Sequence, residues 1–475
     1  MLLGSFAFCL VVFLLIGFSS VLVRQKQSED YLVAGRSVKP ALAGLSAVAT
    51  NNSGYMFIGV IGYTYSTGLS AIWLMIGWIA GDFMASQMVH RRLREAVESH
   101  QALTFPEILA TWWGQQYPLL RRLVALISVL FLGTYAAAQF NAGSKAMHVL
   151  FEWDYTSGAI LGAVMVLFYC FSGGLRASIW TDAAQSVVMI VAMAVMVWTA
   201  VASQGGISET LVRLDQVSDT YMNWFPTDLA FSGVSGPVLF VLGWMFAGFG
   251  VIGQPHIMVR FMALDNVRNL NRARLYYYLW FTAFYFLANA AGLLARLLIP
   301  ESGFDAELAL PTMARDLLHP LAAGLVLAGL FAATISTADS LVLSCSAALS
   351  RDLPSERFQS YTLTRMSTLL VIVLALVIAL YGDKSVFNLV IVAWAVLAAA
   401  FGPLLVVYVF GARPSQPTAI LMVLTGIATV YLWRDQGLSG SIYEIMPAMI
   451  AAWLVFAASK GLDVLVMKGV RGERQ

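Results

Sequence analysis

The segment AVATNNSGYMFIGVIGY, residues 47–63, carries four polar side chains and a glycine in succession within an otherwise apolar stretch. The succession is TNNSG at residues 50–54. Asparagine, serine and glycine tolerate departures from helical geometry better than the apolar residues around them. The segment therefore indicates either a helix whose small polar residues join it to its neighbours or a helix that is interrupted at this point.

The composition of the whole chain places this segment in a membrane. The 475 residues are 59% hydrophobic and 11% charged, with a mean hydropathy of +0.77, which is outside the range of soluble domains. Apolar stretches of the ~17–25 residues that cross a bilayer as a helix recur along the chain. We therefore expect an all-α polytopic membrane protein, in contact with the lipid bilayer, with spans near 2–23, 40–66, 70–89, 123–149, 155–175, 178–203, 234–257, 275–299, 321–350, 366–382, 386–410, 418–433 and 443–459, thirteen in number.

Basic residues predict the orientation of these spans, because Lys and Arg collect on the cytoplasmic side. With the N-terminus outside and the C-terminus inside, 22 of the 28 basic residues lie on that side, including Arg260 in the loop after the span at 234–257. The formal net charge of +2 gives no indication of a nucleic-acid partner. The connections between spans are short, and no obligate protein partner is evident.

The span at 321–350 contains GLFAATISTADSLVLSCSAALS, in which hydroxyl groups and an acid interrupt an apolar helix. A carboxylate at this depth is costly unless it is paired or hydrated, so such acids mark ion or proton paths. The spacing places Ser336, Asp339 and Ser340 on one helical face, and we expect no Lys or Arg at the same depth in the neighbouring spans. This face predicts oxygen ligands for a small cation. The alternative is a structural Asp that caps a neighbouring helix break.

Two further spans carry polar or flexible residues. The span at 178–203 begins with SIWTDAAQ, in which Asp182 and Gln185 share a face, although an Asp in a first turn is also favourable with the helix dipole. The span at 234–257 contains GWMFAGFGVIGQPH and is interrupted by glycines. The span at 234–257 comes five spans after the polar span at 40–66. Paired interrupted helices in two halves are typical of secondary transporters with inverted repeats.

We therefore expect a single transmembrane transporter domain built from two repeats. Its parts are a first accessory span and loop (1–39), a first repeat (40–203), a second repeat (234–410), and the last accessory spans with a short cytoplasmic tail (411–475). An enzyme is not expected, because five scattered histidines supply no cluster of nucleophile, base or metal ligands.

Four motifs in order along nearly the whole chain resemble one family. They are DYLVAGRSVKPALAGLSAVATNNSGYMFIG, FSGGLRASIWTDAAQ, GQPHIMVRFMA and LAGLFAATISTADSLVLSCSAALSRDL. They resemble the sodium:solute symporter family, most of all its bacterial sodium/proline symporter branch. The resemblance implies a LeuT-type fold of two inverted five-helix repeats in the bacterial inner membrane. It also implies alternating access driven by Na+ and import of a small-molecule solute, with an amino acid such as proline as the first candidate.

The same resemblance assigns residues to three sites. It implies a first sodium site formed by Ala49, Asn52, Ala333, Ser336 and Thr337. It implies a second cation site, as in sialic-acid symporters, at Asp182, Asp339 and Ser340 together with Ser336. It implies a solute site at Asn51, Ser53, Gly54, Tyr135, Trp244 and Phe249.

Two departures from the proline branch leave the solute open. Asn51 stands where that branch carries an aspartate, and Trp244 stands three residues farther from Gln254, so that Phe249 or Val251 is an alternative cavity-facing residue. A two-sodium or proton-coupled symporter of a carboxylate, a sugar or pantothenate is the alternative within transport. A transporter-like nutrient sensor is the alternative of another class, and the short tail after Lys460 argues against it.

Overall fold

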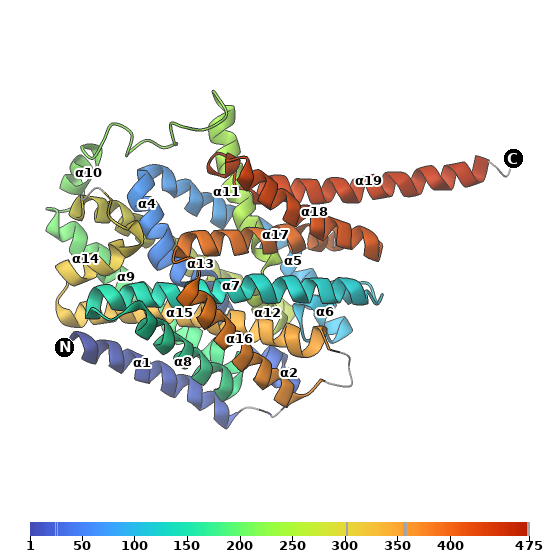
Figure 1. Ribbon diagram of the computed structural model, residues 1–475, viewed down its shortest axis with the longest axis horizontal. Coiled ribbons are helices and arrows are strands. Elements are labelled where there is room, and N and C mark those ends of the chain that lie inside the picture. The colour runs from blue at the N-terminus through green and yellow to red at the C-terminus, as the bar shows by residue number, and fades with distance from the viewer. Residues whose placement is uncertain (24, 26, 301–302, 355–358, 473–475) are drawn as a thin grey trace.

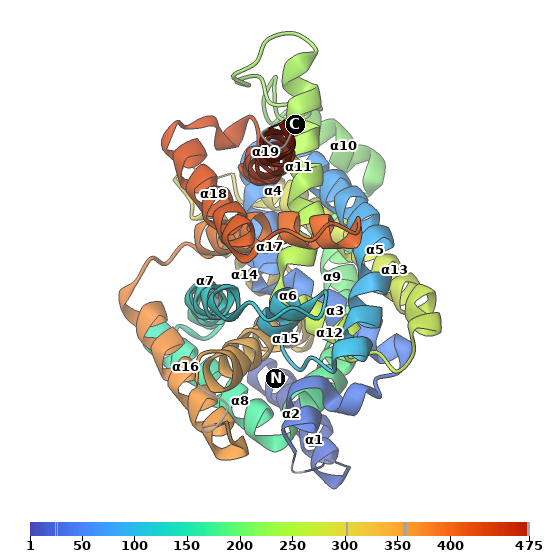
Figure 2. The same ribbon diagram turned by 90° about the vertical axis from the view of Figure 1, so that its right-hand side faces the viewer.

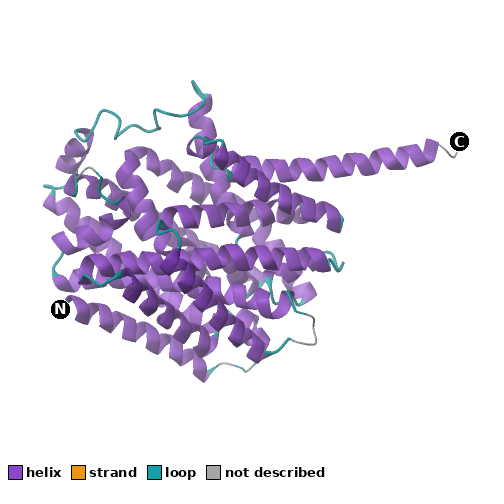
Figure 3. Cartoon of the chain, in the orientation of Figure 1, coloured by secondary structure: helices purple, strands orange, loops and turns teal. Residues whose placement is uncertain are grey.

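The computed structural model describes residues 1–23, 25, 27–300, 303–354 and 359–472. These residues are helical apart from their connecting loops (Figure 3). In chain order the α-helices are α1 (Leu2–Ser19), α2 (Ser28–Val33), α3 (Pro40–Gly54), α4 (Ile61–Thr67), α5 (Ile72–His100), α6 (Phe105–Thr111), α7 (Pro118–Phe151), α8 (Tyr155–Gly173), α9 (Leu175–Ser203), α10 (Ile207–Asp215), α11 (Ser235–Phe249), α12 (Pro255–Met262), α13 (Leu270–Leu298), α14 (Ala309–Leu317), α15 (Pro320–Ala347), α16 (Tyr361–Tyr381), α17 (Val386–Val409), α18 (Gln416–Asp435) and α19 (Ile445–Gly472).

Ten described segments are long and apolar enough to cross a membrane. One of them, Pro40–His100, covers two of the expected spans, and two shorter apolar helices, Tyr155–Phe171 and Ile445–Gly461, coincide with two more. The expectation of an all-α polytopic membrane protein is therefore confirmed. The number of thirteen crossings stays a prediction.

Several helices begin where the sequence supplies a capping hydroxyl. Ser360, Ser385 and Ser415 precede α16, α17 and α18, and each accepts a hydrogen bond from the backbone N–H three residues later. Such a bond satisfies one of the N–H groups that the first turn of a helix leaves without an intrahelical partner. These boundaries therefore follow from local sequence.

Helices α3 and α15 form the centre of the bundle. Helix α15 packs against α7, α9 and α3, and α3 also packs against α13 and α9. Figure 2, in which many helices are seen nearly end-on, places α3, α12 and α15 among the inner helices and α16 and α18 at the periphery. Burial agrees with this placement. In the most apolar 18-residue stretch of the α15 span 83% of the residues are buried, compared with 28% in that of α18. The N-terminus and the end of α19 lie on opposite sides of the molecule (Figure 1).

Candidate functional site

Helix α3 is interrupted within the polar segment at its C-terminal end. Ser53 has φ 38° and ψ −179°, outside the helical region, and a π-helical turn follows at Tyr55–Val60. Side chains bond the backbone N–H groups that the interruption releases. Tyr55 N donates to Ser53 Oγ at 3.0 Å, and Gly54 N donates to Gln139 Oε1 of α7 at 2.8 Å. The sequence interpretation of a broken helix is confirmed, and the protein itself satisfies the backbone there.

The residues expected to bind the first sodium ion lie on packed segments of α3 and α15. All of them are buried, namely Ala49, Asn52, Ala333, Ser336 and Thr337. Thr337 Oγ1 donates to the carbonyl oxygen of Thr50 at 3.0 Å, which joins the two helices directly. Ser336 Oγ donates to the carbonyl oxygen of Ala333 at 3.1 Å. Both hydroxyls keep lone pairs for a further partner.

The side chain of Asn52 adds one oxygen to this region. Asn52 Nδ2 donates to the carbonyl oxygen of Val48 at 2.8 Å, and its buried Oδ1 has no hydrogen-bond partner among the described residues. Neutral carbonyl, amide and hydroxyl oxygens of this kind suit a hard cation. The structure therefore packs the two helices that carry the expected ligands against each other, with a direct hydrogen bond from Thr337 to Thr50, and the role of these ligands in binding sodium stays a prediction.

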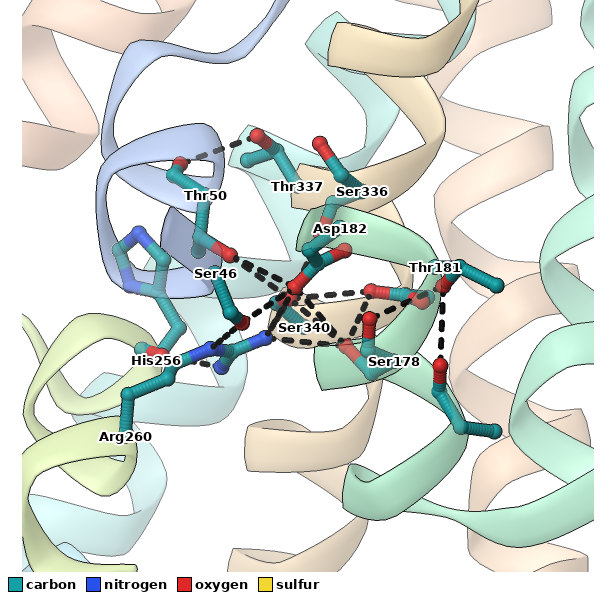
Figure 4. A network of polar contacts seen from close by, with 12 residues as sticks. Ser46, Thr50, Ser178, Thr181, Asp182, His256, Arg260, Ser336, Thr337 and Ser340 are labelled. Atoms are coloured by element: carbon teal, nitrogen blue, oxygen red, sulfur yellow. Dashed lines mark hydrogen bonds and ion pairs between the residues drawn. The ribbon is translucent and has the colours of Figure 1, made fainter. Parts of the chain in front are cut away.

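A second polar group lies beside the first, between α3, α9, α12 and α15 (Figure 4). We call it the acid–arginine cluster and define it by six buried residues, Ser46, Ser178, Asp182, Arg260, Asp339 and Ser340. Thr50 connects the two groups, because its Oγ1 lies 3.3 Å from Ser340 Oγ and 3.4 Å from Asp182 Oδ2. The three residues expected at a second cation site, Asp182, Asp339 and Ser340, thus belong to one cluster.

Arg260 is the basic residue of this cluster. Its Nη2 forms an ion pair with Asp182 Oδ2 at 3.4 Å, and both side chains are fully buried. The guanidinium also donates to Ser178 Oγ at 3.0 Å, to Ser46 Oγ at 3.2 Å and to Ser340 Oγ. Its charge and donor groups therefore lie where the resemblance implies a second cation.

The expectation that no basic side chain lies at the depth of Asp339 is therefore wrong, as is the placement of Arg260 in a cytoplasmic loop. Helix α11 ends at Phe249, a short helical turn follows at Gly250–Gly253, and Pro255 begins the separate helix α12. Helix α12 packs against α3, α5 and α15 and holds Arg260 inside the bundle. Hydropathy along the sequence cannot distinguish this short internal helix from a loop. An arginine ends the apolar stretch whether it lies in an internal helix or in a loop at the membrane surface.

The cluster contains one more acid than base. Ser178 and Ser340 donate to Asp339 Oδ1 at 3.0 and 2.9 Å, and Ser46 donates to Asp182 Oδ2 at 2.6 Å. The other carboxyl oxygens, Asp182 Oδ1 and Asp339 Oδ2, are buried without a hydrogen-bond partner among the described residues. With both acids ionised the cluster carries an uncompensated negative charge, which a bound cation or a proton would neutralise.

Four of the expected solute residues surround the interruption of α3. Tyr135 Oη of α7 donates to Ser53 Oγ at 3.2 Å, and Gly54 is bound through Gln139. Asn51 Nδ2 donates to Tyr277 Oη of α13 at 2.5 Å. All are buried. They form a polar region next to the neutral oxygens of α3 and α15.

The two remaining candidates lie on α11. Trp244 stacks on Tyr443 with ring centres 5.1 Å apart and lies 6.5 Å from Trp78, whose ring is 6.1 Å from Tyr55. Ring contacts through Trp78 and Tyr55 thus connect Trp244 to the interruption of α3. Phe249 is half-buried, and its aromatic contact among the described residues is with Phe246 of the same helix. Among the described residues, no ring contact or side-chain hydrogen bond joins Phe249 to the polar residues of the interruption.

Sequence reasoning missed three further polar partners, Arg260, Tyr277 and Asp82. Asp82 lies in the apolar span at 70–89, so the signal that pointed to Asp339, an acid at membrane depth, could have found it. Tyr277 gave no such signal, because a tyrosine within an aromatic stretch is ordinary in a membrane helix. Its role depends on a contact with α3, 226 residues earlier in the chain.

An all-helical membrane bundle with a broken central helix, and with oxygens of a second helix beside the break, defines a cation-coupled secondary transporter. The model of the sodium:solute symporter family matches residues 31–426. The chain belongs to this family and couples the movement of a solute to sodium.

Named relatives and solved structures agree with this assignment. The high-affinity proline transporter PutP of Bacillus subtilis is 31% identical over 452 residues, which cover 93% of this chain and 94% of the relative. The sodium/proline symporter of Escherichia coli is 30% identical over 460 residues, with 93% and 90% covered. These relatives are transporters.

Two solved structures are similar in fold. A Na+-coupled sialic acid symporter in a substrate-bound outward-open state superposes with a TM-score of 0.77 at 18% identity, covering 95% of this chain and 98% of that one. The nucleobase-cation-symport-1 family transporter Mhp1 in a closed conformation superposes with a TM-score of 0.60 at 14% identity, with 90% and 94% covered. The protein is a multi-pass membrane protein with the LeuT-type fold.

Proposed function

We propose that the protein imports proline, or a small amino acid close to it, together with Na+ across the bacterial inner membrane. The observation that carries the proposal is the contact between the interrupted α3 and the hydroxyl groups of α15, where Thr337 donates to the carbonyl oxygen of Thr50. The names of the most similar relatives support proline as the solute. The protein then acts as a transporter and catalyses no covalent change.

In this proposal sodium binds between α3 and α15 through Ala49, Asn52, Ala333, Ser336 and Thr337. The solute binds on the other side of the interruption, near Asn51, Ser53, Gly54 and Tyr135, with Trp244 closing the aromatic side. Backbone dipoles at a broken helix can orient a zwitterion. The segments 40–203 and 234–410 are the two inverted repeats whose relative motion opens the site to either side, with the N-terminus outside and the C-terminus inside.

Uptake by purified protein in proteoliposomes tests the proposal. We expect labelled L-proline to accumulate when an inward Na+ gradient is applied and not when K+ replaces Na+. A panel of unlabelled competitors, including pantothenate, a monocarboxylate, galactose and sialic acid, identifies the solute class. Sodium-driven uptake of another compound with no effect of proline would contradict the proposed solute, and proline uptake without sodium would contradict the proposed coupling.

A second candidate activity concerns the acid–arginine cluster. We propose that Asp339 and Asp182, with Ser340, hold one additional cation or proton during transport, because the cluster has two acids and one base. Parallel measurement of labelled sodium and proline fluxes gives the coupling ratio. A ratio of two sodium ions supports a second sodium site, and a ratio of one with co-transport of a proton supports a titrating acid. A ratio of one without proton movement contradicts both.

A further inference from the structure

Asp82 is a buried acid outside both candidate cation sites. It lies on α5, its exposed fraction is 1%, and its two carboxyl oxygens accept hydrogen bonds from two different tyrosines of α13. Tyr277 Oη donates to Oδ2 at 2.6 Å, and Tyr278 Oη donates to Oδ1 at 3.0 Å. None of the ion pairs in the described ranges includes Asp82.

This bonding pattern fits an ionised carboxylate. An ionised carboxylate only accepts hydrogen bonds, whereas a protonated one must also donate from one oxygen. Here each oxygen of Asp82 receives a hydroxyl group, and hydrogen bonds to the charged form favour that form. Two tyrosine hydroxyls therefore take the place of a basic partner.

Hydrogen bonds of the Tyr277 hydroxyl connect Asp82 to Asn51. A tyrosine hydroxyl has one hydrogen to donate, and Tyr277 gives that hydrogen to Asp82. Toward Asn51 it can therefore only accept a hydrogen bond. The amide nitrogen of Asn51 must then face Tyr277, and it lies 2.5 Å from Tyr277 Oη. The amide oxygen of Asn51 is consequently turned away from Tyr277.

We propose that Asp82, acting through Tyr277, fixes the Asn51 amide with its oxygen toward the solute and thereby selects solutes with an N–H donor. The inference rests on the proposed function, in which Asn51 lines the solute site. Asp82 and Tyr277 are positioning residues, because they act on the solute through Asn51. In the absence of the carboxylate, Tyr277 can donate to Asn51, and the amide can turn its NH2 group toward the solute instead.

The chain offers a matched control on the same acid. Tyr278 donates to the other oxygen of Asp82 and has no hydrogen bond to Asn51 among the described residues. Tyr278→Phe therefore disturbs the surroundings of Asp82 without interrupting the path to Asn51. Asp82→Leu removes the acceptor of the Tyr277 hydroxyl, and Tyr277→Phe removes the hydroxyl itself. Both variants therefore interrupt that path, and either one tests the proposal if the other fails to fold.

The test compares three competitors of labelled L-proline uptake at saturating Na+. L-Proline carries two N–H donors, N-methyl-L-proline carries one, and N,N-dimethyl-L-proline carries none. A hydrogen bond to a charged donor corresponds to a roughly ten- to hundredfold preference for L-proline over the dimethyl compound. We expect this preference in the wild type and in Tyr278→Phe, and a fall below about threefold in Asp82→Leu and Tyr277→Phe.

The sodium concentration for half-maximal uptake separates this role from general damage. It should stay at the wild-type value in all three variants, because the oxygens of α3 and α15 are unchanged. An unchanged solute preference in Asp82→Leu and Tyr277→Phe would overturn the proposal. An equal loss in Tyr278→Phe would also overturn it, because packing alone would then explain the effect.

Infrared spectroscopy tests the inference independently of the solute. Failure of the wild type to transport proline would refute the proposed function and leave the charge state of Asp82 to be measured directly. The difference spectrum between the wild type and Asp82→Leu should show the loss of an ionised carboxylate band. Loss of a protonated carboxylic acid band would overturn the inference, because Tyr277 would then be free to donate to Asn51.

Discussion

The two polar groups that meet at Thr50 are equally buried but differ in charge. The group between α3 and α15 contains carbonyl, amide and hydroxyl oxygens, whereas the acid–arginine cluster contains two carboxylates and a guanidinium. When a cation leaves the neutral oxygens, no uncompensated charge remains in the membrane. The side-chain charges of the cluster cannot leave, so release of a cation or proton from the cluster would leave an excess negative charge inside the protein.

This difference predicts different roles for the two groups. Substitutions in the neutral group should change sodium dependence and leave the fold intact. Substitutions in the acid–arginine cluster should change stability first, because removal of one partner of a buried ion pair leaves the other charge uncompensated. The predictions below test this division, beginning with the largest expected effect.

Arg260→Met should destabilise the protein most. It leaves Asp182 and Asp339 buried without a base, and loss of one partner of a buried ion pair costs about 3–5 kcal/mol. Thermal unfolding of the purified protein and the yield of monodisperse protein measure the effect. The combination of Arg260→Met with Asp182→Asn removes one charge of each sign and should recover part of the loss. A single variant as stable as the wild type would mean that the guanidinium does not compensate the acids.

Gly54→Ala should lower both stability and transport. A Cβ atom at Gly54 would lie 2.6 Å from Thr334 Cγ2 and 2.8 Å from Ala142 Cβ, so α3 must shift against α15 and α7. Such overpacking costs about 1–3 kcal/mol. Gly133→Ala on α7 is the control, because a Cβ atom there meets no atom within 4 Å apart from the adjacent backbone of its own helix. Equal unfolding temperatures for the two variants would show that the interruption tolerates a side chain.

Combined replacement of Ser336 and Thr337 by alanine should change sodium dependence without loss of the fold. Removal of two hydroxyl oxygens should raise the sodium concentration for half-maximal uptake by at least about tenfold, since a hydrogen bond or ligand oxygen at a charged group contributes ~1.5–3 kcal/mol. Solute affinity at saturating Na+ should be nearly unchanged. Ser344→Ala, two turns farther along α15, is the control. An unaltered sodium requirement in the double variant would exclude these hydroxyls as ligands.

Local patterns predicted the fold and the positions of the polar residues on α3 and α15. The apolar stretches correspond to the helices because membrane thickness sets their length. The interruption at Ser53 was predictable because adjacent asparagines, serine and glycine are unusual in an apolar helix. Ser336 and Thr337 were predictable for the same reason. Their placement opposite α3 came from the family resemblance.

The missed partners depend on tertiary structure. Arg260 reaches the acids because Pro255 begins a short helix inside the bundle, and hydropathy treats any arginine as a residue at the membrane surface. Tyr277 meets Asn51 because α13 packs against α3. Spacing along one helix predicts which residues share a face, but it does not predict which helix covers that face.

Asp339→Asn should have the smallest effect on stability, and its sign should be opposite to that of Asp182→Asn. Asp182 accepts from Ser46 and is the ion-pair partner of Arg260, so its neutralisation removes the carboxylate that contacts the guanidinium directly. Asp339 accepts from Ser178 and Ser340, and an asparagine oxygen can accept both bonds. The exchange removes the excess negative charge, so we expect an unfolding free energy equal to the wild type or higher by up to about 1 kcal/mol.

The same Asp339→Asn variant separates charge balance from coupling. If Asp339 holds an additional sodium ion or proton, the variant should move one positive charge fewer per solute, or lose the pH dependence of uptake, while its first sodium site stays intact. Unfolding measured beside Asp182→Asn, together with the coupling ratio from parallel sodium and proline fluxes, decides between these roles. Destabilisation as large as that of Asp182→Asn would make Asp339 a second structural partner of Arg260. A neutral effect on stability with an unchanged coupling ratio would leave a single sodium ion, bound by the neutral oxygens of α3 and α15, to drive transport.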